Sequence, residues 1–93
     1  IETDTARILT YNAAWQLQNN LRDADSAISI AKLFSSETSV KSTNRALQIF
    51  GSYGYIKDNS AERLYRDAKY TEISDGPSEV QRMLIADSMI EQM

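Results

Sequence analysis

The sequence predicts an all-α fold, a single helical domain that covers residues 1–93. Apolar residues recur every three or four positions along most of the chain, and no stretch shows the two-residue alternation of a strand. All three glycines and the one proline fall in two short segments, 51–54 and 76–77. Because glycine and proline mark turns, these segments divide the chain into helices.

The first helix is expected from about Glu2 to Leu21. Asn19, Asn20 and the charged residues that follow them interrupt its pattern. The apolar positions that carry the helical spacing are Ala6, Leu9, Ala13 and Leu17.

The second helix is expected to begin where Asp25 or Ser26 caps it and to run to Phe50. Gly51 then ends it, since glycine tolerates a left-handed stop. The centre of this segment, residues 35–39, is polar and has no strong helix preference. Its small hydroxyl side chains would let another helix pass closely, so we expect one continuous helix.

Two further helices each begin with a polar residue that is followed three positions later by Glu or Gln. Asn59 with Glu62 predicts the start of a third helix, which ends near Glu72. Ser78 with Gln81 predicts the start of a fourth helix, which continues to the C-terminus.

The composition excludes several classes of function. The chain has 13 acidic and 10 basic residues, a net charge of −3, so binding to a nucleic-acid backbone through a basic patch is not expected. It has no cysteine and no histidine, which removes disulfides, thiol nucleophiles, Ser-His-Asp catalysis and most zinc sites. No apolar run reaches the length of a membrane span and no export signal is visible, so a cytoplasmic or mitochondrial-matrix location is expected.

Three segments of the chain are similar to motifs of the acyl-CoA dehydrogenase family. They occur in the family's order and spacing, and the resemblance extends over essentially the whole chain. In chain order the segments are ALQIFGSYGY (46–55), ERLYRDAK (62–69) and SEVQR (78–82).

The resemblance implies a partial up-down four-helix bundle, the later part of the family's C-terminal domain. The family's N-terminal helical domain, its middle β-domain and the first bundle helix would be absent from these 93 residues. The chain would then be a fragment or a stand-alone partial module. Ile1 in place of methionine indicates a trimmed chain.

The resemblance also implies an activity, the FAD-dependent α,β-dehydrogenation of an acyl-CoA thioester. A carboxylate removes the α-proton while the β-hydride moves to the flavin. Asp75 matches the position of the family's glutamate base, with one methylene less, and Gly76 would contact substrate. Three alternatives stay open: an aspartate base as in nitroalkane-oxidizing flavin oxidases, a base on an earlier helix outside this chain, and a plain turn role for Asp75, since Asp-Gly is a common turn pair.

Two segments match regions of the family that contact FAD. The first, which would touch the FAD of a neighbouring subunit, is Gln48, Ile49, Phe50, Gly51 and Ser52. The second is Pro77, Ser78 and Glu79. Ser52 replaces the family's usual second glycine and Pro77 its usual threonine, and proline loses an amide donor.

The expected partners are an acyl-CoA substrate, an electron acceptor such as electron-transfer flavoprotein, and further copies of the same chain. The two long helices would leave apolar faces open to water, which a second copy or the folded-back fourth helix could cover. Without the other domains, the 93 residues are expected to have no dehydrogenase activity. A non-catalytic helical oligomerization module is the remaining alternative.

Overall fold

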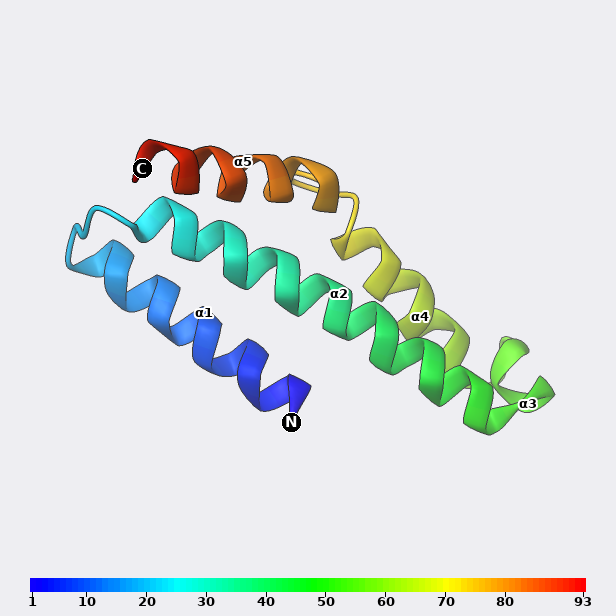
Figure 1. Cartoon of the computed structure of the whole chain (residues 1–93). Helices are drawn as coiled ribbons and strands as arrows, with labels where there is room; N and C mark the ends of the chain where they lie inside the picture. The colour runs from blue at the N-terminus through cyan, green and yellow to red at the C-terminus, as the bar shows by residue number, and fades with distance from the viewer.

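The computed structural model describes all of residues 1–93 and contains helices and turns without any strand (Figure 1), which confirms the all-α prediction. None of its helices is both long and apolar enough to cross a membrane. The helices are α1 (Glu2–Gln18), α2 (Ala24–Phe50), α3 (Ser52–Tyr55), α4 (Ser60–Thr71) and α5 (Ser78–Glu91).

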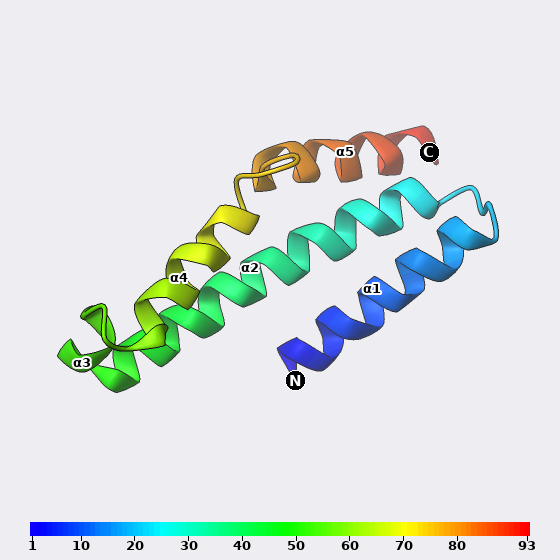
Figure 2. The same ribbon diagram turned by 180° about the vertical axis from the view of Figure 1, so that it is seen from behind.

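Helix α2 is the central element of the fold. α1 returns along one side of α2, while α4 and then α5 follow the other side in succession, as the two opposite views show (Figures 1 and 2). α1 does not pack against α4 or α5. The short helix α3 folds back onto the end of α2 and also contacts α4. The result is an elongated body with extents of 49 × 22 × 19 Å.

The helices touch one another through small side chains. Ala13 on α1 packs with Ala27 and Ala31 on α2, and Leu9 lies against this cluster. Small residues allow two helix backbones to approach closely, but each buries little apolar surface. No large side chain is fully buried anywhere in the chain.

The bulky apolar residues instead lie on open faces of the helices. Ile8 and Trp15 on α1 are 67% and 57% exposed, and Met83 on α5 is 64% exposed. The accessible surface is 6965 Å², whereas a compact monomer of this mass exposes about 5,400 Å². The radius of gyration is 15.7 Å, against about 12 Å for a compact chain of this length. The chain therefore leaves bulky apolar side chains of α1 and α5 exposed; α5 packs against α2 but does not cover α1.

Both ends of the first interhelical connection differ from prediction. α1 ends at Gln18 and not near Leu21, because the Asn19 side chain donates to the carbonyl oxygen of Trp15 at 2.8 Å and Asn20 adopts a φ of 53°. Asparagine tolerates this left-handed conformation better than most residues.

The predicted cap of α2 at Asp25 or Ser26 is wrong. Asp23 precedes the helix, with no side-chain cap, and Ala24 is its first residue. Ala24 is buried, so the earlier start places one further small residue on the packed face.

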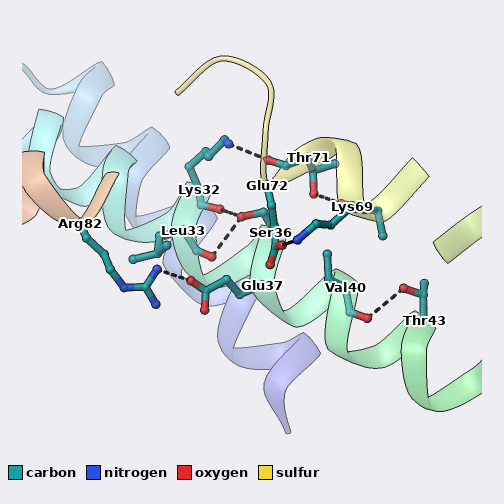
Figure 3. Close-up of polar contacts among 11 residues, drawn as sticks. Lys32, Leu33, Ser36, Glu37, Val40, Thr43, Lys69, Thr71, Glu72 and Arg82 are labelled. Atoms are coloured by element: carbon teal, nitrogen blue, oxygen red, sulfur yellow. Dashed lines mark hydrogen bonds and ion pairs between the residues drawn. The ribbon is translucent and has the colours of Figure 1, made fainter. Parts of the chain in front are cut away.

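The polar centre of α2 does not interrupt the helix, which confirms the expected single helix of 27 residues. Ser36 is buried and its hydroxyl donates to the carbonyl oxygens of Lys32 at 2.8 Å and Leu33 at 3.1 Å. Figure 3 shows this local bonding within the helix. The hydroxyl group is thus satisfied without leaving the helix, a recognised pattern for serine in helix interiors.

The two predicted helix starts have different outcomes. Asn59 caps α4 as expected, since its side-chain oxygen accepts from the amide of Ala61 at 2.8 Å. The predicted capping role of Ser78 is wrong, because Pro77 precedes α5 and no side chain caps it. The φ of Pro77 is −63°, the value that its ring fixes, and its backbone is still extended before the helix begins.

Candidate functional site

The predicted base, Asp75, lies in the turn of residues 72–77 between α4 and α5, here called the α4–α5 turn. Asp75 and Gly76 both have positive φ, 51° and 94°. The amide of Ser78 donates to the carbonyl oxygen of Glu72 at 3.1 Å and closes the turn. Asp75 is exposed, so its carboxylate is accessible to a molecule beside the turn.

A lysine on α2 holds this turn from the side of the central helix. Lys32 Nζ donates to the carbonyl oxygens of Thr71 at 2.6 Å, Ser74 at 3.0 Å and Gly76 at 2.9 Å; Figure 3 draws the bond to Thr71. Thr71 is the last residue of α4, so the ammonium group also lies at the negative end of that helix dipole. One cation therefore fixes the end of α4 and both residues that flank Asp75.

A glutamine on α5 holds the same turn from the other side. Gln81 is only 7% exposed, and its Nε2 donates to the carbonyl oxygen of Gly76 at 3.2 Å. A Cβ atom at Gly76 would lie 2.4 Å from that Nε2. The positive φ favours glycine here, and a side chain at this position would also displace the end of the glutamine side chain.

The sequence pattern did not point to Lys32 and assigned Gln81 only to a helix start. One signal was available for the lysine. Lys32 stands inside the apolar run Ile30 to Phe34, where a charged side chain needs polar partners. That position could have marked it as a structural or functional group.

Two ion pairs surround the start of α5 (Figure 3). Arg82 Nη1 on α5 lies 2.6 Å from Glu37 Oε1 on α2, and this hydrogen bond raises the pKa of Arg82. Lys69 Nζ lies 2.8 Å from Glu72 Oε1, and that hydrogen bond raises the pKa of Lys69 above its ordinary value of 10.5. Both pairs flank the α4–α5 turn.

The second predicted cofactor segment lines a small pocket next to these pairs. Pro77, Ser78 and Glu79 form one wall of this pocket, whose volume is about 250 Å³. The hydroxyl group of Ser78 is buried and has no hydrogen-bond partner. Contacts from this segment to a bound molecule would therefore come from its exposed parts, chiefly Glu79.

The first predicted cofactor segment, Gln48 to Ser52, is exposed throughout at the far end of α2. Gln48, Gly51 and Ser52 line an open hollow of about 490 Å³ together with Asn44, Leu47 and Tyr55. No charged side chain lines this hollow. The amide of Gly51 is already bonded to the carbonyl oxygens of Leu47 and Gln48.

The two segments lie at opposite ends of α4, which separates the hollow from the α4–α5 turn (Figures 1 and 2). α4 has 12 residues, which corresponds to a helix length of about 18 Å. The chain thus brings Asp75, Gly76 and residues 77–79 together but does not bring Gln48–Ser52 to the same place.

Comparison with known proteins identifies the family. The sequence model described as "Acyl-CoA dehydrogenase, C-terminal domain" matches residues 1–90. The chain is 46% identical over 87 residues to 3-(aryl)acrylate reductase of Clostridium sporogenes, covering 94% of this chain and 23% of that protein. It is 42% identical over 87 residues to mitochondrial short-chain specific acyl-CoA dehydrogenase of Bos taurus, covering 94% and 21%.

A solved structure supports the same family. Butyryl-CoA dehydrogenase of Megasphaera elsdenii superposes with a TM-score of 0.89 at 36% identity, over 96% of this chain and 23% of that chain. The 93 residues thus span less than a quarter of the length of these relatives. The match over residues 1–90, the shared fold and the three ordered motifs show that this chain belongs to the acyl-CoA dehydrogenase family and corresponds to its C-terminal domain.

Proposed function

We propose that the chain supplies the C-terminal part of an FAD-dependent acyl-CoA dehydrogenase, with Asp75 as the base that removes the substrate α-proton. One observation carries the proposal: Asp75 is an exposed carboxylate on a turn that Lys32 and Gln81 hold from two sides. A base is effective when its position is fixed before the substrate arrives.

The proposed chemistry needs little else from this chain. The thioester carbonyl acidifies the α-proton, and the carboxylate of Asp75 accepts it. FAD, when bound, supplies the acceptor for the β-hydride. Gly76 stands next to Asp75 and would contact the substrate through its backbone. Asp75 is exposed in this chain, so the surfaces that exclude water from the reaction would come from other parts of the protein.

The residues at the end of α2 fit contacts with an uncharged part of FAD. Gln48 and Ser52 present free hydrogen-bonding groups in the hollow of about 490 Å³. The hollow has no cation to neutralize a diphosphate. We therefore assign Gln48–Ser52 to the adenosine or ribose side of a neighbouring subunit's FAD, and Pro77–Glu79 to a separate FAD contact beside Asp75.

The open apolar faces support a homo-oligomer. The accessible surface exceeds that of a compact monomer of this mass by about 1,500 Å². Further copies and the remaining parts of the enzyme would cover the exposed side chains of α1 and α2. An acyl-CoA substrate and an electron acceptor such as electron-transfer flavoprotein complete the proposed set of partners.

The direct test replaces Asp75 in a full-length flavoenzyme that carries residues 1–93. Asp75→Asn keeps the shape of the side chain and removes the base, so flavin reduction by an acyl-CoA should be lost while ligand binding stays nearly intact. Asp67→Asn on the exposed face of α4 is the matched control and should leave the rate unchanged. Reduction at the wild-type rate in Asp75→Asn would place the base outside this chain.

Reduction of an α,β-unsaturated acyl compound is a second candidate, favoured by the 46% identity to 3-(aryl)acrylate reductase. In that direction reduced FAD would supply the hydride to the β-carbon, and the protonated form of the same carboxyl group would return a proton to the α-carbon. Assays in both directions distinguish the two reactions. Peroxide formation from a nitroalkane would instead indicate the flavin-oxidase alternative, and a purified full-length protein without FAD would indicate the non-catalytic module.

A further inference from the structure

We propose that Lys32 is a positioning residue, whose ammonium group sets the backbone of the α4–α5 turn and thereby the place from which Asp75 acts. This inference rests on the proposed function of Asp75 as the base. Lys32 lies on a different helix from the turn, more than 40 positions away in the sequence. It does not need to touch the substrate to affect the reaction.

The hydrogen bonds of Lys32 include both neighbours of the proposed base. The carbonyl oxygens of Ser74 and Gly76, one on each side of Asp75, accept from Lys32 Nζ at 3.0 Å and 2.9 Å. The third bond, to Thr71 at 2.6 Å, ties the same cation to the end of α4. An ammonium group has three N–H donors, and all three are used on this turn.

The turn needs such an anchor because its backbone is unfavourable without one. Asp75 has a φ of 51°, a left-handed conformation that costs free energy for a residue other than glycine, although aspartate tolerates it better than most. Hydrogen bonds from a cation to carbonyl oxygens are stronger than those between neutral groups. Lys32 is partly buried, so water replaces these bonds poorly when the side chain is shortened or made apolar.

Loss of the anchor should appear as a loss of rate and not of binding. Displacement of a catalytic group by about 1 Å can reduce a rate about 100-fold. We expect Lys32→Met, which keeps the length of the side chain and removes all three donors, to slow flavin reduction by butyryl-CoA at least tenfold. The FAD content and the dissociation constant of a substrate analogue should change less than threefold.

The experiment uses a full-length flavoenzyme made by replacing the matching segment of the Megasphaera elsdenii enzyme with residues 1–93. Lys41→Met is the matched control, because Lys41 is on the same helix and bonds to Glu2 on α1, not to the turn. It should leave the reduction rate within twofold of wild type. Lys32→Arg, which keeps a cation with several donors, should recover part of the rate lost in Lys32→Met and covers the case in which Lys32→Met does not fold.

Hydrogen exchange tests the turn without any chemistry. The amide of Ser74 donates to the carbonyl oxygen of Tyr70 at 2.9 Å, and its exchange should accelerate at least tenfold in Lys32→Met and not in Lys41→Met. Faster exchange with an unchanged reduction rate would overturn the positioning role, as would unchanged exchange. If Asp75→Asn retains full activity, Asp75 is not the base. The hydrogen-exchange result then still decides separately whether Lys32 fixes the turn.

Discussion

Gly51 and Gly76 both have positive φ, 64° and 94°, but they lie in very different surroundings. A Cβ atom at Gly51 would meet nothing within 4 Å, whereas one at Gly76 would lie 2.4 Å from the side chain of Gln81. The Gly51 turn borders an open hollow without charged groups. The Gly76 turn is bonded to Lys32 and Gln81 and flanked by ion pairs.

The difference separates two uses of the same residue. Gly51 is required by the backbone alone, because its combination of φ 64° and ψ −139° is nearly confined to glycine. Gly76 is favoured by its backbone, and a side chain there would also displace the end of the Gln81 side chain. The open turn suits a surface that receives another molecule, and the bonded turn suits a group whose position must not change.

The largest effect is expected from Gly76→Ala. Strain at a φ of 94° and the contact with Gln81 together should lower the free energy of unfolding by about 2–4 kcal/mol. Chemical denaturation measures this loss. Gln81→Ala removes the contact, so Gly76→Ala should lower the free energy of unfolding by less in the Gln81→Ala background than in the wild type. An equal cost in both backgrounds would show that the crowding at Gly76 has no energetic consequence.

Gly51→Ala should lower the free energy of unfolding by less, about 1–3 kcal/mol, because only the backbone is strained and no atom lies within 4 Å of the added Cβ. The same denaturation experiment measures it, and Gly51→Ala should also leave the hydrogen exchange of Ser74 unaltered. If Gly51→Ala destabilizes the protein more than Gly76→Ala, the contrast between an open and a crowded turn is wrong.

A smaller effect on stability is expected from Asn59→Ala, at the end of the connection between α3 and α4. Asn59 caps α4 through a bond of 2.8 Å to the amide of Ala61, and loss of such a cap typically costs about 1 kcal/mol. Asn59→Asp keeps the acceptor and serves as the control. If the alanine and aspartate variants have the same stability in thermal unfolding, the side-chain cap of Asn59 does not stabilize the start of α4.

The smallest effect concerns the ion pair beside the bonded turn. The hydrogen bond to Glu72 raises the pKa of Lys69 above 10.5. The ion pair of Lys69 with Glu72 therefore stabilizes the folded state fully at pH values below the pKa of Lys69 in the unfolded chain. This stabilization is lost as the pH rises through the higher pKa of Lys69 in the folded chain. NMR titration of Lys69 should show the raised pKa, and Glu72→Gln should return it toward 10.5. An identical titration in both proteins would show that the pair does not persist in solution.

The residues near each turn show how far sequence reasoning extends. The helical spacing, the glycine stops and the Asn59 cap were readable because each depends on neighbours within about four positions. The motifs around Gln48–Ser52 and Pro77–Glu79 gave the family, which the comparisons confirm. The cap of α2 and the role of Ser78 were wrong because burial of Ala24 and the ring of Pro77 decide those starts.

The sequence by itself determined that the chain is helical, where its turns lie and which residue stands at the proposed base position. Only the tertiary structure decided that Lys32 reaches across to the turn that carries Asp75, and that small residues are buried while bulky ones stay exposed. The physical reason is the distance along the sequence over which each interaction acts. Helix propensity and capping act between near neighbours, whereas a hydrogen bond between residues 44 positions apart exists only after α2, α4 and α5 have packed together.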